Sequence, residues 1–339
     1  MTAYFVRRFL LIIPTFIGIT LAVFVVMHFV PGGPVERQIM RYRMAAAEGG
    51  GGGRVQVELP AEAIEEMKRY YGFDKPIHIR YALWLWNLMH LDLGRSYVYQ
   101  DPVWDVIKSR FPVSIFLGIT GFFLSYIVCV PLGVYKAIRH GSKFDIASSI
   151  VVFLGYSVPG WALGTALLVF FGGGSFLNWF PLGGFRPDNW DYLGVFQKIA
   201  SQLHYMFLPV LCYMIGSFAT LTILMKNSVM ENLGQDYIRT AFAKGLSERR
   251  VIFVHALRNS MIPIATGLGH VISLILAGSF LIEKVFNIDG MGYLGYTSIL
   301  QRDYPVALGI LVISSVLLLV GNILSDMIYV LVDPRIRFR

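Results

Sequence analysis

Six long apolar runs constrain the fold of this sequence more than any other feature. They cover residues 9–30, 113–135, 146–171, 203–225, 262–282 and 306–331, and Asp326 is the one charged residue within them. A hydrocarbon core about 30 Å thick needs about 20 apolar residues of helix. Closed β-barrels also satisfy the backbone in lipid, but their strands would give short alternating segments instead. The sequence therefore predicts an all-α integral membrane protein with six transmembrane helices.

Composition excludes several other classes of protein. Of the 339 residues, 55% are hydrophobic and 15% are charged, whereas an average soluble domain is roughly 25% charged. The net charge of +8 does not indicate nucleic-acid binding, because most basic residues lie between the apolar runs. Cys129 and Cys212 both lie inside apolar runs, which excludes a disulfide framework and a four-cysteine metal site. We expect no bound metal and no nucleic-acid partner.

The spacing of the runs divides the chain into three parts. Residues 1–30 form an N-terminal segment with the first helix, 31–112 form an insert, and 113–339 form a core with five helices. The first run follows two arginines as a signal peptide would, but no small-residue cleavage pattern follows it, so we expect an uncleaved span. Within the insert, glycines at 49–53 indicate a linker and the apolar spacing of 60–90 is helical. We expect a small capping subdomain outside the membrane.

Basic residues in the short connections predict the orientation. With the N-terminus in the cytoplasm, 14 Lys and Arg residues fall on the inner side and four fall in the short outer loops. Positive charges are retained on the cytoplasmic side of a membrane. Both termini are therefore predicted to be cytoplasmic, and the insert to lie on the opposite side of the membrane.

Motifs for energy conversion and hydrolysis are missing. The sequence contains no G-x-x-x-x-G-K-[ST] phosphate loop, no H-E-x-x-H and no G-x-S-x-G. The chain is therefore not expected to be its own ATPase, a protease or a hydrolase.

Ionisable residues inside the runs are few, namely His28, His204, His270 and Asp326. Such residues are candidates for function in a membrane protein. His28 and His204 lie near span ends, where we expect structural roles. His270 follows two glycines and is a candidate for a polar path, and Asp326 is expected to pair locally.

The segment 226–261 between the fourth and fifth runs carries the most informative pattern. Gly245 is suited to end one helix in a left-handed conformation, and Ser247 to cap the next. Val251, Val254 and Leu257 would then share one face of a short helix, which can insert into a groove on a soluble partner. A basic amphipathic linker lying on lipid headgroups is the alternative interpretation of this segment.

This segment resembles the cytoplasmic EAA loop found in permease subunits of bacterial ABC importers. Motifs along the rest of the chain resemble those of the dipeptide/oligopeptide/nickel permease family, and they occur in the same order along the sequence. They are Pro31-Gly32-Gly33-Pro34, Tyr71-Gly72-Phe73-Asp74-Lys75-Pro76, Leu91-Asp92-Leu93-Gly94, Gly290-Met291-Gly292, Arg302-Asp303-Tyr304-Pro305 and Leu331-Val332-Asp333-Pro334-Arg335. Together they cover nearly the whole chain.

Within that family the sequence is most similar to the Yej-type permeases of oligopeptide and microcin C importers. The narrower likeness rests on the glycine-rich insert, Phe171-Gly172-Gly173-Gly174-Ser175, Phe180-Pro181-Leu182-Gly183 and Asn322-Ile323-Leu324-Ser325-Asp326. Two positions depart from the general loop pattern. Thr240 stands where a glutamate is usual, and Pro263 comes later than the usual proline.

The resemblance implies a type I ABC importer permease fold in the bacterial inner membrane. It implies a second homologous permease, cytoplasmic ABC ATPase domains and a periplasmic peptide-binding protein as partners. ATP and Mg would be used by the ATPase, so this chain would bind no cofactor and contain no catalytic residue. The residues expected to couple it to the ATPase are Thr240, Ala241, Lys244, Gly245, Leu246, Ser247, Glu248 and Arg249.

A path for variable peptides is expected to be wide and built from small residues. The candidates in and after the fifth run are Gly267, His270, Ser273, Gly278 and Glu283. Helix packing is an equally good explanation for the small residues. Glu283 is a candidate to attract a peptide amino terminus, with a loop role or pairing with Lys284 as alternatives.

Two other function classes remain open from sequence. A secondary carrier or channel without ATPases would need intramembrane charge pairs or broken-helix repeats. Pro159-Gly160 is the one candidate break, with no second copy. A membrane-embedded enzyme would need a reactive constellation, and none is visible.

Overall fold

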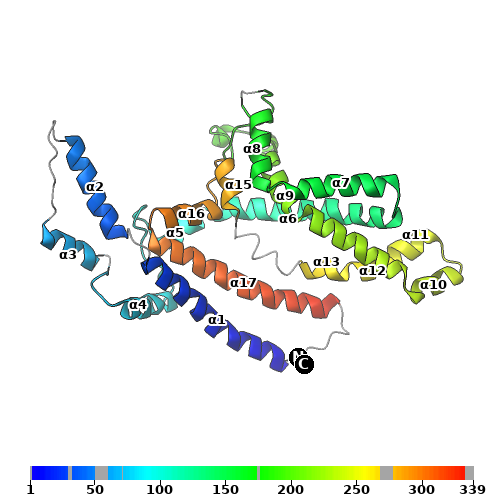
Figure 1. The fold of residues 1–339 in the computed structure, drawn as a ribbon, viewed down its shortest axis with the longest axis horizontal. Helices are drawn as coiled ribbons and strands as arrows, with labels where there is room; N and C mark the ends of the chain where they lie inside the picture. Colours follow the sequence, from blue (N-terminus) through cyan, green and yellow to red (C-terminus); the bar gives the residue numbers. More distant parts are fainter. Residues whose placement is uncertain are drawn as a thin grey trace. The chain divides into compact units, whose positions relative to one another are not determined.

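The computed structural model describes residues 2–29, 33–49, 60–70, 72–173, 176–267 and 278–332. These residues form helices and connecting turns, and none of them lies in an extended strand (Figure 1). The all-α class is therefore confirmed for the described chain. By contact, the chain divides into two compact units. Unit 1 combines residues 1–8, 110–294 and 316–339, and unit 2 combines 9–109 and 295–315.

The long helices match five of the six predicted spans. They are α1 (Thr2–Phe29), α6 (Phe111–Ile138), the pair α7 (Lys143–Ser157) and α8 (Gly160–Phe171), α9 (Val195–Leu233) and α17 (Tyr304–Val332). Four helical segments of the described chain are long and apolar enough to cross a membrane, and the bent pair can supply a fifth span. The predicted sixth span, 262–282, lies largely outside the described residues, which include α13 (Ile262–Thr266) before the gap.

The run 146–171, predicted as one span with a candidate break at Pro159-Gly160, is bent by 96° between α7 and α8. Proline disfavours helical geometry in the residue before it and cannot donate a backbone hydrogen bond. Val158 is accordingly extended, with φ −97° and ψ 117°, and Pro159 precedes the first residue of α8. Gly160 approaches α9 closely, because a Cβ there would lie 2.7 Å from the carbonyl oxygen of Cys212. The break is thus fixed both by local chemistry and by packing.

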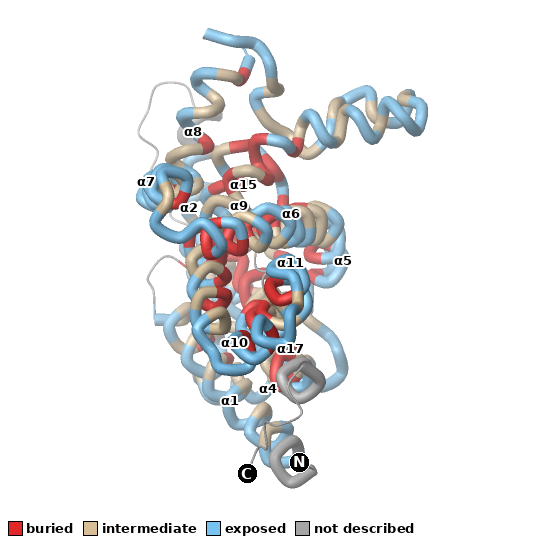
Figure 2. Tube along the Cα trace, turned by 90° about the vertical axis from the view of Figure 1, so that its right-hand side faces the viewer, coloured by how far each residue is buried: buried red, intermediate tan, exposed pale blue. Residues whose placement is uncertain are grey.

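Unit 1 is built around the pair α6 and α9, which lie side by side in Figure 1. Glycines bring the two helices together. A Cβ at Gly133 would lie 2.6 Å from Cβ of Met225, and one at Gly121 would lie 3.1 Å from Cβ of Tyr213. Buried apolar residues from both helices complete the packing, and the tube in Figure 2 marks buried positions along them in red.

Unit 2 contains the insert helices α2 (Pro34–Gly49), α3 (Ala61–Tyr70), α4 (Ile77–Met89) and α5 (Val103–Lys108). Neither α3 nor α4 has a fully buried residue. Among the insert helices, burial is greatest on α5, where Val103 and Ile107 are 0% exposed and pack at Gly309 of α17. The insert thus obtains its buried core partly from a long helix.

A buried carboxylate organises the turn before α5. The Asp303 carboxylate accepts hydrogen bonds from the hydroxyl of Ser96 and from the backbone amides of Tyr97 (3.0 Å) and Val98 (3.3 Å). Asp303 and Ser96 are buried, and such charge-assisted bonds are the strong ones. The turn 96–99 is therefore attached firmly to the segment that begins α17.

Candidate functional site: the loop after helix α9

The loop 226–261 folds as a compact group of short helices at the end of α9. They are α10 (Asp236–Ala243), α11 (Glu248–Arg250), the π-helix η2 (Val251–Ala256) and α12 (Leu257–Ser260). A small apolar core joins them, made by buried Ile238, Ala241, Val251 and Ala256, with Leu233 and Leu246 packed against it. Figure 1 shows α10 and α11 beyond the end of α9, with α12 leading back beside it. The loop can therefore move as one body.

Gly245 makes the turn between α10 and α11 in the left-handed conformation predicted from sequence, with φ +78°. Its amide donates to the carbonyl oxygen of Phe242 at 2.9 Å. A Cβ at this position would meet nothing within 4 Å, so the need for glycine comes from the backbone conformation alone. Ser247 stands at the N-cap position of α11 with extended geometry, but its side chain makes no capping hydrogen bond.

The apolar face predicted for the second helix is wrong in one position. Val251 is 0% exposed, whereas Val254 is 53% exposed. The segment is a π-helix, whose wider turn brings residues i and i+5 onto one face. Val251 and Ala256 accordingly share the buried face, and Val254 turns outward.

The coupling candidates differ in exposure. Ala241 is buried and Leu246 is half-buried, whereas the other six are exposed: Thr240, Lys244, Gly245, Ser247, Glu248 and Arg249. The Thr240 hydroxyl donates to the carbonyl oxygen of Asp236 at 3.0 Å. A hydroxyl bonded within its own helix cannot replace the ion pair that a glutamate at this position would make.

The sequence argument missed two exposed aromatic residues. Phe242 on α10 is 46% exposed and Phe253 on η2 is 51% exposed. Large apolar side chains exposed on a charged loop are typical of contact surfaces. Phe242 directly follows Ala241 of the loop core, and Phe253 directly follows the buried Ile252.

A buried ion cluster ties α9 to its neighbours just before the loop. The Asp145 carboxylate of α7 accepts from Lys226 Nζ of α9 at 2.7 Å and lies 3.2 Å from Lys136 Nζ of α6. The Lys136 side chain is 1% exposed and also donates to the hydroxyls of Ser148 and Ser149. Because both lysines depend on one carboxylate, three helices are held together where the loop begins.

The other end of the loop is attached to α9 as well. The Ser228 hydroxyl donates to the carbonyl oxygen of Ser260 at 3.0 Å, and the Ser260 hydroxyl donates to that of Ser228 at 3.2 Å. Both residues are buried. The loop therefore begins and ends at fixed points on one helix.

The candidate path residues that the structure describes are packed against neighbours. A Cβ at Gly267 would lie 2.5 Å from Oη of Tyr126, and one at Gly278 would lie 2.5 Å from Oε1 of Glu283. These distances match the helix-packing interpretation that the sequence left open. His270 and Ser273 lie outside the described residues.

Glu283, in α15 (Phe280–Val285), is 0% exposed. Its carboxylate accepts hydrogen bonds from the hydroxyl of Tyr213 (3.2 Å) and the amides of Ser279 (3.3 Å) and Tyr293 (2.7 Å). Burial raises the pKa of this carboxyl, and the hydrogen bonds oppose that rise. These contacts correspond to the loop role, with no solvent-accessible surface left to attract a peptide in this conformation.

Three other ionisable residues of the apolar runs also have local partners. His28 Nδ1 lies 2.6 Å from the carbonyl oxygen of Phe24, and His204 Nε2 lies 2.6 Å from that of Trp179. Asp326 forms an ion pair with Arg8, from the opposite end of the chain. The two histidines thus have the kind of contact expected for structural residues near span ends, whereas Asp326 pairs with a residue distant in the sequence.

Comparison with known proteins decides the family. Residues 129–338 match the family of inner membrane components of binding-protein-dependent transport systems. The chain belongs to this family. It is 40% identical to the Peptidoglycan transport system permease protein YejB of Agrobacterium fabrum, over 100% of this chain and 99% of the relative. The Inner membrane ABC transporter permease protein YejB of Escherichia coli is 40% identical with the same coverage. The Oligopeptide transport system permease protein AppB of Bacillus subtilis is 34% identical over the full length of both chains.

Membership confirms the resemblance found in the sequence, including its Yej-type likeness. The chain is a multi-pass inner membrane permease subunit of an ABC importer. The loop 226–261 lies within the matched residues, and the insert precedes them.

Proposed function

We propose that this permease carries peptides or peptide-containing compounds inward, and that the loop 226–261 is its contact with the ATPase. The observation that carries the proposal is the loop itself, which has its own apolar core, a pair of hydrogen bonds between Ser228 and Ser260 that fixes its end to α9, and exposed Phe242 and Phe253. The names of the relatives support the substrate class, because they refer to peptidoglycan and oligopeptide transport.

A partner that pulls on the exposed residues of the loop moves α9 with it. The loop core keeps α10 and η2 together, and the Asp145 cluster passes the displacement of α9 to α6 and α7. Interfaces of this kind switch between discrete packings rather than deforming continuously. ATP-driven closure of the partner domains would thereby alternate the access of the path between the two faces of the membrane.

In this scheme the chain contributes no catalysis and no cofactor. ATP and Mg are bound by separate ATPase domains, a second homologous permease completes the path, and a periplasmic binding protein delivers the peptide. The path is proposed to include the region of Gly267, His270, Ser273 and Gly278, with Glu283 supporting its outer end. The insert 31–112 is proposed to be periplasmic, and both termini cytoplasmic.

Reconstitution tests the function directly. The chain alone in liposomes should neither hydrolyse ATP nor accumulate a labelled tripeptide under a pH gradient. Addition of the second permease, the ATPases and the binding protein should give ATP-dependent peptide uptake. Accumulation by the chain alone under a pH gradient would instead establish a secondary carrier.

Cysteine labelling tests the orientation. In a variant lacking Cys129 and Cys212, Glu62→Cys should react with an impermeant thiol reagent from the periplasm, and Arg250→Cys only after the inner face is opened. The reverse pattern would contradict the proposed topology.

A further inference from the structure

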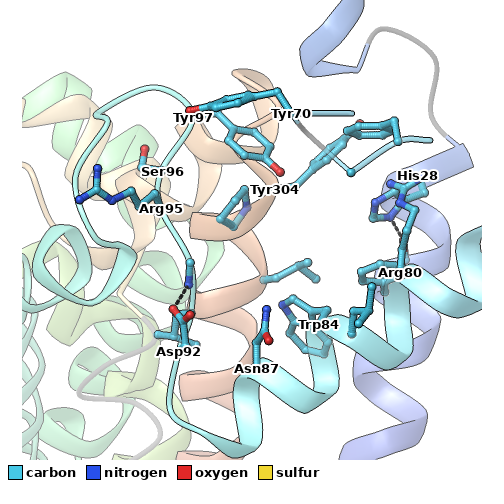
Figure 3. Close-up of a pocket in the computed structure, with 18 of the residues that line it drawn as sticks. His28, Tyr70, Arg80, Trp84, Asn87, Asp92, Arg95, Ser96, Tyr97 and Tyr304 are labelled. Atoms are coloured by element: carbon cyan, nitrogen blue, oxygen red, sulfur yellow. Dashed lines mark hydrogen bonds between the residues drawn. The ribbon is translucent and has the colours of Figure 1, made fainter. Parts of the chain in front are cut away.

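Unit 2 contains a cavity of about 480 Å³ that the transport scheme does not use. The helix α4 lines it with Arg80, Leu83, Trp84 and Asn87, which lie on one helical face at positions i, i+3, i+4 and i+7. Figure 3 shows Trp84 and Asn87 facing Tyr304 across this space. The cavity is therefore mixed in character, with aromatic walls and the cationic side chains of Lys75, Arg80 and Arg95.

Arg80 has no carboxylate or carbonyl partner among the residues that the structure describes. Its guanidinium carbon lies 4.1 Å from the centre of the Phe73 ring. The one acidic side chain lining the cavity, Asp92, accepts a hydrogen bond from the amide of Gly94 at 2.8 Å. Burial lowers the pKa of the Arg80 guanidinium, and Tyr97, Tyr304 and Asp74 oppose that shift, in this order of size. A half-buried cation without an ion pair is a site for an anion.

The cavity lies beside a predicted membrane span. The hydroxyl of Tyr81 on α4 lies 3.0 Å from that of Thr20 on α1, and the ring of Trp84 lies 5.9 Å from that of Phe24. Thr20 precedes the end of α1 at Phe29 by nine residues, which corresponds to about 14 Å of helix. Tyr81 therefore meets α1 near the middle of the predicted span 9–30, whereas the Arg80 guanidinium stacks on Phe73, whose ring centre lies 5.8 Å from that of His28, next to the end of α1. The guanidinium is thus level with the end of this span, where lipid headgroups meet acyl chains.

An exposed apolar stripe adjoins the cavity on α4. Ile79, Leu83 and Trp86 are 40%, 43% and 59% exposed and lie on one face at positions i, i+4 and i+7. Leu83 belongs both to this stripe and to the cavity wall. An anionic group at Arg80 would therefore lie next to a surface suited to a hydrocarbon chain.

We propose that this cavity binds a membrane phospholipid, with its phosphate on Arg80 and an acyl chain along Ile79, Leu83 and Trp86. A guanidinium is well matched to phosphate oxygens and is more weakly hydrated than an ammonium group. A water-soluble peptide could supply a carboxylate, but it would leave the apolar stripe uncovered. A phospholipid would both pair with the Arg80 guanidinium and cover the apolar stripe.

Native mass spectrometry of the full-length chain, purified in detergent with its partner subunits, tests the proposal. The probes are phosphatidylglycerol, diacylglycerol with the same acyl chains, and inorganic phosphate. Phosphatidylglycerol should be retained, diacylglycerol should be retained less, and millimolar phosphate should not displace the lipid. Arg80→Gln should reduce phosphatidylglycerol retention roughly tenfold, as expected for the loss of one charge-assisted contact.

Two further variants separate binding from folding. Lys68→Gln on α3 removes an exposed cation outside the cavity and should leave retention unchanged. Arg80→Lys keeps the charge and should restore part of the retention lost in Arg80→Gln. Equal retention of both lipids, equal retention by Arg80→Gln, or displacement by phosphate or by a tripeptide would each overturn the proposal.

Discussion

The loop 226–261 and the insert 31–112 both leave the apolar spans, but they are stabilised in different ways. The loop has its own buried core, continues directly from α9, and is hydrogen-bonded back to α9 at its end through Ser260 and Ser228. The insert helices α3 and α4 have no fully buried residue, and α4 packs its Tyr81 and Trp84 against α1. A segment that transmits force must hold its own shape. A segment that packs on a span can leave a lined cavity at the membrane surface.

The largest loss of stability is expected for a substitution of Asp145, which holds α9 to α6 and α7 at the start of the loop 226–261. Asp145→Ala would leave Lys136 and Lys226 without their shared carboxylate, and breaking a buried ion pair costs about 3–5 kcal/mol. Thermal unfolding of the chain in detergent measures the loss. Asp236→Ala, which breaks an exposed pair with Arg239, is the matched control and should cost less than about 1 kcal/mol. Similar losses for both variants would show that the anchor is unimportant.

A matched pair of valines tests the loop core. Val251→Ala removes two methyl groups at a position that is 0% exposed and should destabilise the loop by about 2 kcal/mol. Val254→Ala, at a position that is 53% exposed, should change stability by less than about 0.5 kcal/mol. Hydrogen exchange of the α10 amides reports the difference. If the two variants exchange alike, the π-helical register is wrong.

Substitutions at Gly245 should destabilise the loop by a smaller amount, and this loss should come from the backbone conformation alone. Gly245→Ala must adopt φ +78° and should lose about 1 kcal/mol, with no steric contribution because the space is open. Gly245→Asn should lose less, since asparagine tolerates the left-handed region. Both variants are compared by hydrogen exchange in the loop and by peptide-stimulated ATP hydrolysis in the reconstituted transporter. Equal losses of loop stability in Gly245→Ala and Gly245→Asn would show that the cost does not come from the left-handed backbone conformation.

The smallest effect is expected in the insert. Tyr81→Phe keeps the ring on α1 and removes the hydroxyl that contacts Thr20, so α4 should lose about 1 kcal/mol or less of local stability. Limited proteolysis of the insert measures this change, with uptake unaffected. A loss of stability as large as that of Val251→Ala would mean that the insert depends on this one contact. The difference in stabilisation between the insert and the loop 226–261 would then disappear.

The sequence by itself determined the helical class, the four helices of the described chain that are long and apolar enough to cross a membrane, and the conformation at Gly245. Apolar length and a glycine flanked by helix-forming segments are local signals, and they depend on no distant residue. The same local chemistry made Pro159 visible as a break, because a proline restricts the residue before it wherever it occurs. The family likeness was also legible, since it rests on motifs in order along the chain.

Tertiary structure decided what the buried polar groups do. Glu283 was a candidate for attracting substrate, yet its carboxylate is occupied by Tyr213 and backbone amides brought from other segments. The outward turn of Val254 depends on a π-helix that periodicity of 3.6 residues does not predict. The cluster at Asp145 joins residues 9 and 81 positions apart in the chain. Such pairings are set by how helices meet, and a single sequence records no helix contacts.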